Sequence, residues 1–276
     1  MKREILKTTK NVRTFKTYSK ILFFTIFIIL LMPFQLKAQE VDWNSEFEQG
    51  FTKFQQGDWK DALSHLGKIA NALPTLDLDV DSEGMVYFAC GVCTQQMGDI
   101  NQSIQYNSKA ITLPIKQTEL RIQILSSQLF NYSYLSMNNE CEEIINDMIR
   151  IYNSKKYIGL ASQIMTYYSE LGKFSKVIEF EEDIPNFIIP NPNTEIDKIS
   201  NTIQWNTIYM SLAHSFKELK DFNKALDYCQ KSLDTITENN KNNRSVIYSL
   251  MSQIYMLQGD KATSLKYQKL SLESEE

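Results

Sequence analysis

One phrase recurs six times along this chain, and the recurrence limits the possible folds more than any other feature of the sequence. "QQGDWKDALSHLGKIANALP" (55–74) resembles "QMGDINQSIQYNSKAITLP" (96–114), and "ELKDFNKALDYCQKSL" (218–233) and "LQGDKATSLKYQKLSL" (257–272) follow the same plan. Two weaker copies are "SMNNECEEIINDMIRI" (136–151) and "ELGKFSKVIEF" (170–180). The turn residues at the centres of the copies are Gly57, Gly98, Asn138, Gly172, Lys220 and Gly259. Their spacings of 41, 40, 34, 48 and 39 residues predict an array of one repeated structural unit.

Each turn residue lies between two segments with helical periodicity. Ahead of Lys220, the residues Ile208, Leu212 and Phe216 follow one another at intervals of four, which places them on one helix face. A second apolar stripe follows the turn at Phe222, Ala225, Leu226, Cys229 and Leu233. The pattern predicts two antiparallel helices per copy, joined by a residue in the left-handed conformation. The first residues after three of the turns, Asp58, Asp99 and Asp260, are suited to cap the second helix.

The copies resemble the tetratricopeptide repeat (TPR), a helix–turn–helix unit with a nominal period of about 34 residues. Small residues stand where the two helices of that family cross: Gly50, Gly91 and Ala213 seven before the turn, and Ala62 and Ala225 five after it. The resemblance covers residues 43–274 and is strongest in the fifth copy. It implies an all-α, right-handed superhelical solenoid of about six TPR-like helix–turn–helix pairs.

One segment interrupts the repeats. Residues 181–198 ("EEDIPNFIIPNPNTEIDK") contain Pro185, Pro190 and Pro192, a density of prolines that forbids a continuous helix. We expect an extended connector whose apolar residues, 187–189, pack on neighbouring helices or, alternatively, contact a partner.

The first 38 residues have the character of a targeting segment. A basic region precedes the uncharged apolar run "ILFFTIFIILLMPF" (21–34), and Ala38 is a small residue suited to the last position before cleavage. These features predict a secretory signal peptide at 1–38 and a repeat domain at 39–276, exported to the periplasm or the cell exterior. An uncleaved membrane anchor is the alternative, and in that case residues 21–34 would be the only membrane contact.

The charge of the exported part argues against nucleic-acid binding. The leader holds eight basic residues and one acidic residue, so 21 basic and 32 acidic residues remain in 39–276, a net charge of −11. A domain this acidic repels phosphate backbones and anionic membrane surfaces. A protein or peptide partner is expected instead.

The sequence "CGVC" at 90–93 has the spacing of redox and zinc motifs. Cys90 and Cys93 fall in the middle of a predicted helix, whereas a redox cysteine needs a helix N-terminus to lower its pKa. A zinc site would need two further ligands, and Cys141 and Cys229 lie in other copies. We interpret both cysteines as core residues and expect no cofactor, no metal and no catalytic residue, with a redox or metal protein as the less favoured alternative.

The TPR resemblance implies that residues of each first helix line a concave, partner-binding groove. Projected copy by copy, the candidates are Phe47, Phe51, Phe54, Phe88, Val92, Gln95, Gln128, Tyr132, Leu135, Met210, His214, Lys217, Gln253 and Met256. The predicted function is a non-enzymatic, exported scaffold that binds a protein or peptide of unnamed identity. The alternative from another class is a sensory or regulatory TPR domain of an envelope signalling system.

Overall fold

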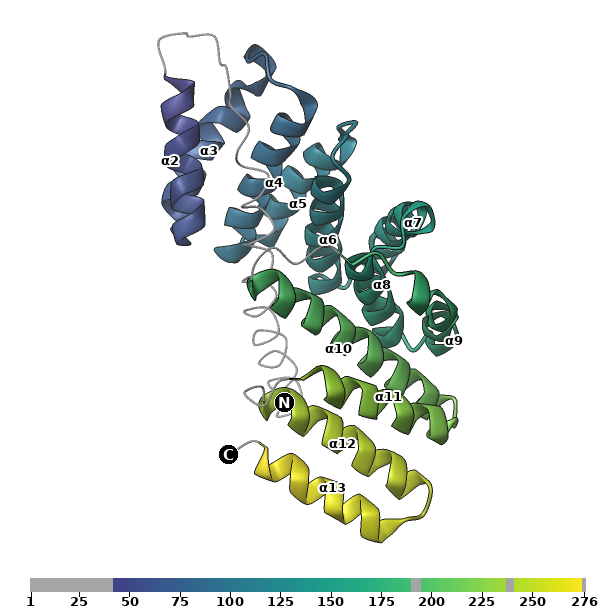
Figure 1. Ribbon diagram of the computed structural model, residues 1–276. Helices are drawn as coiled ribbons and strands as arrows, with labels where there is room; N and C mark the ends of the chain where they lie inside the picture. Colours follow the sequence, from purple (N-terminus) through teal and green to yellow (C-terminus); the bar gives the residue numbers. More distant parts are fainter. Residues whose placement is uncertain (1–41, 190–194, 237–240, 275–276) are drawn as a thin grey trace. The chain divides into compact units, whose positions relative to one another are not determined.

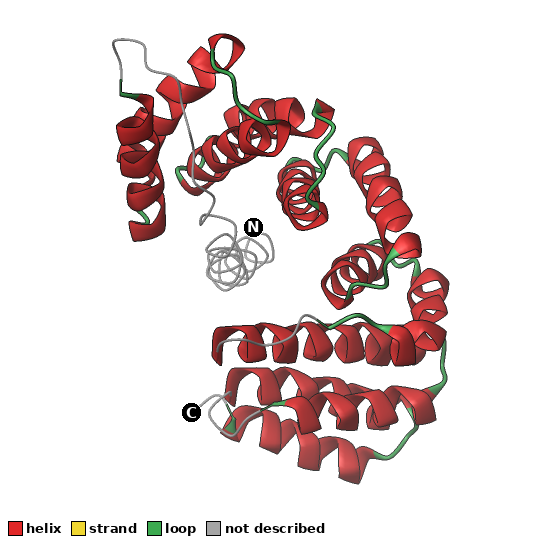
Figure 2. Cartoon of the chain, turned by 45° about the horizontal axis from the view of Figure 1, so that its top comes forward, coloured by secondary structure: helices red, strands yellow, loops and turns green. Residues whose placement is uncertain are grey.

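The computed structural model describes residues 42–189, 195–236 and 241–274, and helices dominate these segments (Figures 1 and 2). Contacts divide the chain into two compact units, 1–147 and 148–276, and the boundary falls inside one helix. The all-α fold class is therefore confirmed. The signal-peptide prediction at 1–38 lies outside the described residues. Among the helices that are described, none combines the length and the apolar character needed to cross a bilayer.

The first unit contains two complete helix pairs and most of a third. Its helices are α2 (Trp43–Gln56), α3 (Trp59–Ala72), α4 (Val80–Gln96), α5 (Ile100–Thr112), α6 (Thr118–Tyr134) and the first part of α7 (Asn138–Ser154), with a short 3-10 helix at Leu73–Thr75. Its hydrophobic core joins α2, α3 and α4, and it continues to α6 through Leu120 and Ile124.

The second unit completes the array. It contains the end of α7, then α8 (Ile158–Glu170), α9 (Phe174–Ile178), a 3-10 helix at Glu179–Asn186, α10 (Glu195–Glu218), α11 (Phe222–Thr235), α12 (Lys241–Leu257) and α13 (Lys261–Glu273). Six first helices, α2 to α12 in steps of two, thus alternate with six second helices in the described part of the chain.

The six turns share one hydrogen-bond pattern. In the first, the amide of Gly57 donates to the carbonyl of Phe54, and the amide of Asp58 donates to the carbonyl of Lys53. This Schellman arrangement needs a left-handed residue, and Gly57 has a φ of 76°. The turns predicted at the other three glycines and at Lys220 (φ 65°) are confirmed.

The third turn was placed wrongly by the sequence pattern. The left-handed residue is Ser136, with a φ of 58°, whereas Asn138 is the first residue of α7. The amide of Met137 donates to the carbonyl of Tyr132, which is the same bond that closes the other turns. The pattern favoured asparagine because its side chain tolerates the left-handed region, but the position at which α6 ends decides which residue adopts it.

The corrected register is supported by burial in the second helices. The residue five positions after each turn packs at the helix crossing and exposes at most 2% of its surface. These residues are Ala62, Ser103, Cys141, Val177, Ala225 and Ser264. Cys141 fits this row only when the turn is counted from Ser136.

Aspartates cap the second helices where the chain provides them. The carboxylates of Asp58, Asp99 and Asp260 accept from backbone amides three residues later, as predicted. Asp221 does the same at the start of α11. Such a cap contributes about 1 kcal/mol to helix stability.

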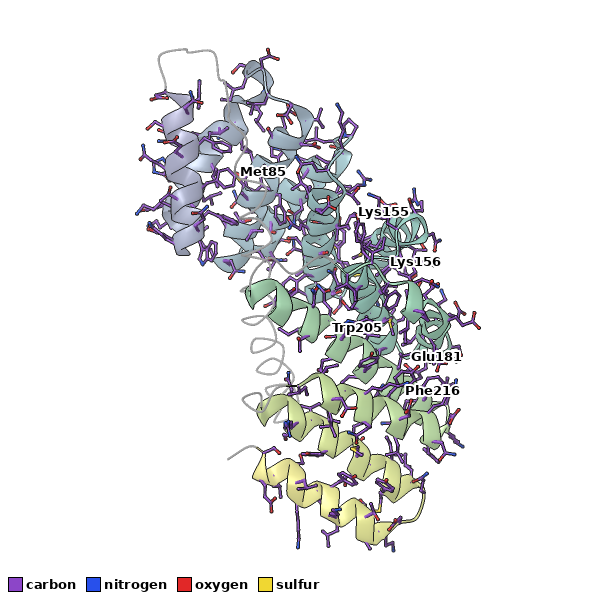
Figure 3. The ribbon with its side chains drawn as sticks, viewed as in Figure 1. Met85, Lys155, Lys156, Glu181, Trp205 and Phe216 are labelled. Carbon is purple, nitrogen blue, oxygen red and sulfur yellow. The ribbon has the colours of Figure 1, made fainter. Side chains whose placement is uncertain are left out.

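The irregular segment of the second unit replaces most of one second helix. Of the extended connector expected at 181–198, residues up to Asn186 form a 3-10 helix instead, and α10 already begins at Glu195. Residues 187–189 are not helical, and residues 190–194 of the predicted connector lie outside the described residues. Glu181, labelled in Figure 3, accepts hydrogen bonds from Lys224 (2.8 Å) and from the hydroxyl of Tyr228 (2.8 Å), which tie this segment to α11. Phe187 is buried and its ring lies 5.8 Å from that of Trp205, so packing is confirmed for this residue of the apolar patch. Ile188 and Ile189, in contrast, are each 45% exposed.

Candidate binding surface

In the first two copies, the apolar residues predicted to line the groove lie in the hydrophobic core of the first unit. Phe47, Phe51 and Phe54 contact one another along α2, with ring centroids 4.5 Å and 6.2 Å apart. Phe88 and Val92 of α4 belong to the same core and expose 1% and 3% of their surfaces. These side chains hold the helices of the unit together, and a partner-binding role for them stays a prediction.

Two further candidates belong to a buried polar network between the second and third copies. The side-chain amide of Gln95 donates to Asn131 (2.7 Å), and Asn131 donates to the hydroxyl of Ser103 (2.8 Å). Gln128 donates to the hydroxyl of Ser108 at 3.1 Å. Because amides buried without partners cost about 1–3 kcal/mol each, these bonds specify how α4, α5 and α6 fit together.

The remaining candidates of the first unit are affected by the turn correction. Because the third copy turns at Ser136, Gln128, Tyr132 and Leu135 stand two residues out of register with the candidates of the other copies. The residue equivalent to Phe51 and Val92 is Phe130 rather than Tyr132. Leu135 is 39% exposed at the end of α6.

In the second unit, the structure brings predicted residues of two first helices together. Met210, His214 and Lys217 follow one another along α10, and Gln253 and Met256 lie on α12. The ammonium group of Lys217 lies 3.4 Å from the amide oxygen of Gln253. Gln253 is exposed and Met256 is 54% exposed, so this part of the predicted surface is open to solvent.

His214 is the ionisable group at the centre of this surface. Burial lowers its pKa, the positive charge of Lys217 lowers it further, and Glu218 opposes both effects. Its Nε2 atom lies 3.7 Å from Glu218, and its Nδ1 atom is buried and has no hydrogen-bond partner among the described residues. Lys217 in turn contacts Glu218 at 2.7 Å. The neutral imidazole therefore predominates at pH 7, and the charge of the lysine is largely compensated.

Sequence reasoning missed an aromatic neighbour of this surface and three exposed leucines at the turns of the second unit. Phe174, the first residue of α9, packs edge-on against the ring of His214 with centroids 5.4 Å apart. Leu171, Leu219 and Leu257 are 40%, 43% and 60% exposed, and each lies one or two residues before a turn. The repeat alignment locates these two positions in every copy, but it gives no exposure for them. We call Phe174, His214, Lys217, Gln253 and Met256 the α10–α12 patch.

The thiols of the "CGVC" motif are buried inside α4. Cys90 and Cys93 are free cysteines with no exposed surface. Burial raises the pKa of Cys90 well above its usual value and raises that of Cys93 to about 12. A thiol in this state is not nucleophilic at neutral pH. Within the described segments, no three histidine, cysteine or acidic residues are grouped as a metal site would require.

Comparison with known proteins identifies the repeat. Residues 207–236, which span the end of α10 and all of α11, match the tetratricopeptide repeat model, so the copy with the best sequence match is confirmed. No curated protein matches the sequence. Among solved structures, the apo form of RapI is 12% identical with a TM-score of 0.53, and the match covers 85% of this chain and 98% of RapI. BtubC (BKLC) from P. vanneervenii is also 12% identical, with a TM-score of 0.51 and coverage of 86% and 92%. These likenesses show that the fold is that of a TPR array.

Proposed function

We propose that this chain is an exported, non-enzymatic scaffold that binds a protein or peptide through the first helices of its repeats, with the α10–α12 patch as the main contact in the second unit. The observation that carries this proposal is the meeting of Lys217 and Gln253 from separate helices at 3.4 Å, beside the exposed side chain of Met256.

The chemistry of the patch suits a polypeptide. Phe174 and Met256 supply apolar surface, and methionine adapts its shape to varied partners. Gln253 and the neutral ring of His214 can exchange hydrogen bonds with peptide groups. The compensated charge of Lys217 argues against a dedicated clamp for a carboxylate or a phosphate.

Site-specific photocrosslinking in the native host tests this proposal. A photoreactive residue replaces Met256 in the full chain, and the matched control carries it at Gln230, an exposed residue of the second helix α11. We expect one protein to be captured from position 256 and not from position 230. His214→Ala in the same background should weaken that capture at least several-fold.

Equal capture from both positions, or capture that His214→Ala leaves unchanged, would overturn the assignment of the α10–α12 patch. A scaffold that used another face would still capture a partner when the photoreactive residue is moved to Leu135 of the first unit. Failure at positions 135 and 256 alike would remove the scaffold function as proposed.

A further inference from the structure

α13 is the last helix that the structure describes, and two of its leucines face outward while two of its serines face α12. Ser264 and Ser271 expose 2% and 8% of their surfaces, and each hydroxyl lies 3.1 Å from a serine hydroxyl of α12. Leu265 and Leu272 are 54% and 61% exposed. Burying a leucine side chain contributes roughly 1.5–3 kcal/mol, so this helix leaves a favourable contact unused within its own unit.

The same positions are covered in three other second helices. Leu265, Gln268 and Leu272 stand six, nine and thirteen residues after the turn at Gly259. All three are exposed, whereas their equivalents are buried or half-buried in α3 (Leu63, Leu66, Ala70), α5 (Ile104, Asn107, Ile111) and α11 (Leu226, Cys229, Leu233).

A hydrogen bond identifies what covers these positions. The side-chain amide of Asn107, nine residues after its turn, donates to the hydroxyl of Ser127 at 2.8 Å. Ser127 belongs to α6, the first helix of the following copy. The face of α13 that carries Leu265, Gln268 and Leu272, which we call the end face, therefore continues an established helix-packing surface of this array.

The charges on α13 indicate which helix would fit the end face. Lys266 and Glu273 are exposed and lie seven residues apart, as do Leu265 and Leu272. The midpoint between the two leucines and the midpoint between the two charged residues differ by one residue, and both fall between Gln268 and Leu270. A face whose apolar and charged groups are symmetric in this way is complementary to itself when two copies run antiparallel.

We propose that the end face of α13 pairs with the end face of a second copy of this chain about a twofold axis near Gln268. Leu265 of each copy then packs against Leu272 of the other. With this pairing, Lys266 is about two residues away from the point directly opposite Glu273 of the other copy. At a rise of about 1.5 Å per residue the offset along the helix is about 3 Å, which long side chains can close. This pairing is independent of the α10–α12 patch and leaves that patch free.

The pairing is expected to be reversible. A single helix pair falls below the roughly 1,200 Å² buried by standard interfaces, which places it among weak, transient contacts. Lys269 from both copies would lie close to the axis, where like charges oppose association. Lys269→Gln should therefore increase the dimer fraction at a given concentration.

Thiol crosslinking tests the geometry, because all four native cysteines are buried. Gln268→Cys in the full chain should give a dimer with a short bifunctional maleimide, in proportion to protein concentration. Gln105→Cys, an exposed position on α5, is the control and should stay monomeric. Because Leu272 is largely exposed, Leu272→Lys can be added without disturbing the fold, and it should reduce the Gln268→Cys crosslink at least five-fold.

A charge exchange distinguishes a second copy from any other partner. Lys266→Glu and Glu273→Lys should each weaken the crosslink, and the double variant should restore it, because both charges of the pair are then reversed in the same dimer. Absence of a crosslink in a Gln268→Cys variant with the circular dichroism of the parent would overturn the proposal. So would a double variant no better than the single ones, or a crosslink to a protein of different mass.

Discussion

Replacement of Gly91 by alanine should destabilise the first unit, because the α4–α5 crossing has no room for a Cβ atom. A Cβ at this position would clash with the Oδ1 atom of Asn107 and would lie 3.1 Å from its Cγ atom. Asn107 is fully buried and its amide is committed to the hydroxyl of Ser127 at 2.8 Å, so the side chain cannot move away without losing that bond.

The magnitude follows from three contributions. Overpacking a close-packed site costs about 1–3 kcal/mol, and a buried amide left without its partner costs a similar amount. Alanine in place of glycine inside a helix returns about 0.5–1 kcal/mol. Because relief of the clash and loss of the hydrogen bond are alternatives rather than a sum, we expect a net loss of about 0–2.5 kcal/mol, which is about 1–3 kcal/mol relative to a glycine-to-alanine change without a clash. For a protein of this size the midpoint of thermal unfolding falls by roughly 2–4 °C per kcal/mol.

Thermal unfolding followed by circular dichroism measures this effect, and the chain offers a matched control. Gly67 lies inside α3, and a Cβ there would meet no heavy atom within 4 Å. Gly67→Ala should therefore raise stability by about 0.5–1 kcal/mol. In an Asn107→Ala background, Gly91→Ala should cost much less than it does alone, since the clashing atom is gone. A Gly91→Ala variant as stable as Gly67→Ala, or a cost unchanged by Asn107→Ala, would refute the reasoning.

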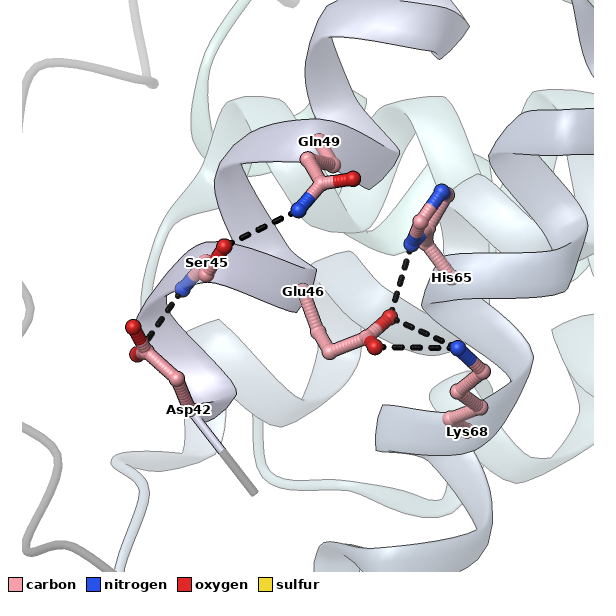
Figure 4. Close-up of polar contacts among 6 residues, drawn as sticks. All are labelled: Asp42, Ser45, Glu46, Gln49, His65 and Lys68. Atoms are coloured by element: carbon pink, nitrogen blue, oxygen red, sulfur yellow. Dashed lines mark hydrogen bonds and ion pairs between the residues drawn. The ribbon is translucent and has the colours of Figure 1, made fainter.

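Three further predictions follow from the buried thiols, a carboxylate and the leader. Cys90 and Cys93 should not react with a thiol reagent at pH 7 until the protein is denatured, and fast labelling of the native protein would revive the redox alternative. The carboxylate of Glu46 is hydrogen-bonded to Lys68 and to His65 of α3, and both contacts lower its pKa (Figure 4). Because the pKa is lowered from 4.5, the ionised carboxylate stabilises the folded state above pH 4.5, and this contribution is lost as the pH falls through the pKa in the folded protein. Glu46→Gln should therefore make the melting temperature depend less on pH in the acid range. A melting temperature with the same pH dependence in both proteins would contradict this. The mass of the protein isolated from its host should correspond to a chain starting at Gln39, whereas an intact Met1 would indicate an anchor.

Much of the array could be predicted from the sequence because its repeat carries local signals. Glycine at a turn and aspartate after it act within a few residues, so Gly98 and Asp99 identify a turn and a cap without knowledge of the rest of the fold. The third turn failed because Ser136 adopts the left-handed conformation without being a residue type that prefers it. The spacing of the turns was the available signal. With the third turn at Ser136, the distances to Gly98 and Gly172 are 38 and 36 residues, which is more even than the 40 and 34 residues obtained with Asn138.

The candidate surface was less predictable because the same face of a first helix packs against neighbouring helices in some copies and is open to solvent in others. Phe54 and Met256 occupy equivalent positions, three residues before a turn, yet one is 1% exposed and the other 54% exposed. Sequence position gives the direction of a side chain, but neighbouring helices decide whether it is covered. Phe174 stands two residues after its turn, as Phe222 does after Lys220, and it was missed because only the first helices were searched for groove residues.

The polar network between α4, α5 and α6 limits how this array can change by recombination. Gln95 and Ser103 of the second copy are hydrogen-bonded to Asn131 of the third, so α6 matches the polar groups of the second copy. A deletion or duplication that brought another second helix against α6 would, except for α13 with Ser264, place alanine, cysteine or valine where Asn131 needs the hydroxyl oxygen of Ser103. The side-chain amide of Asn131 would then be buried without an acceptor. We therefore expect insertions and losses of whole repeats to occur elsewhere along the chain, whereas α4, α5 and α6 should be kept together.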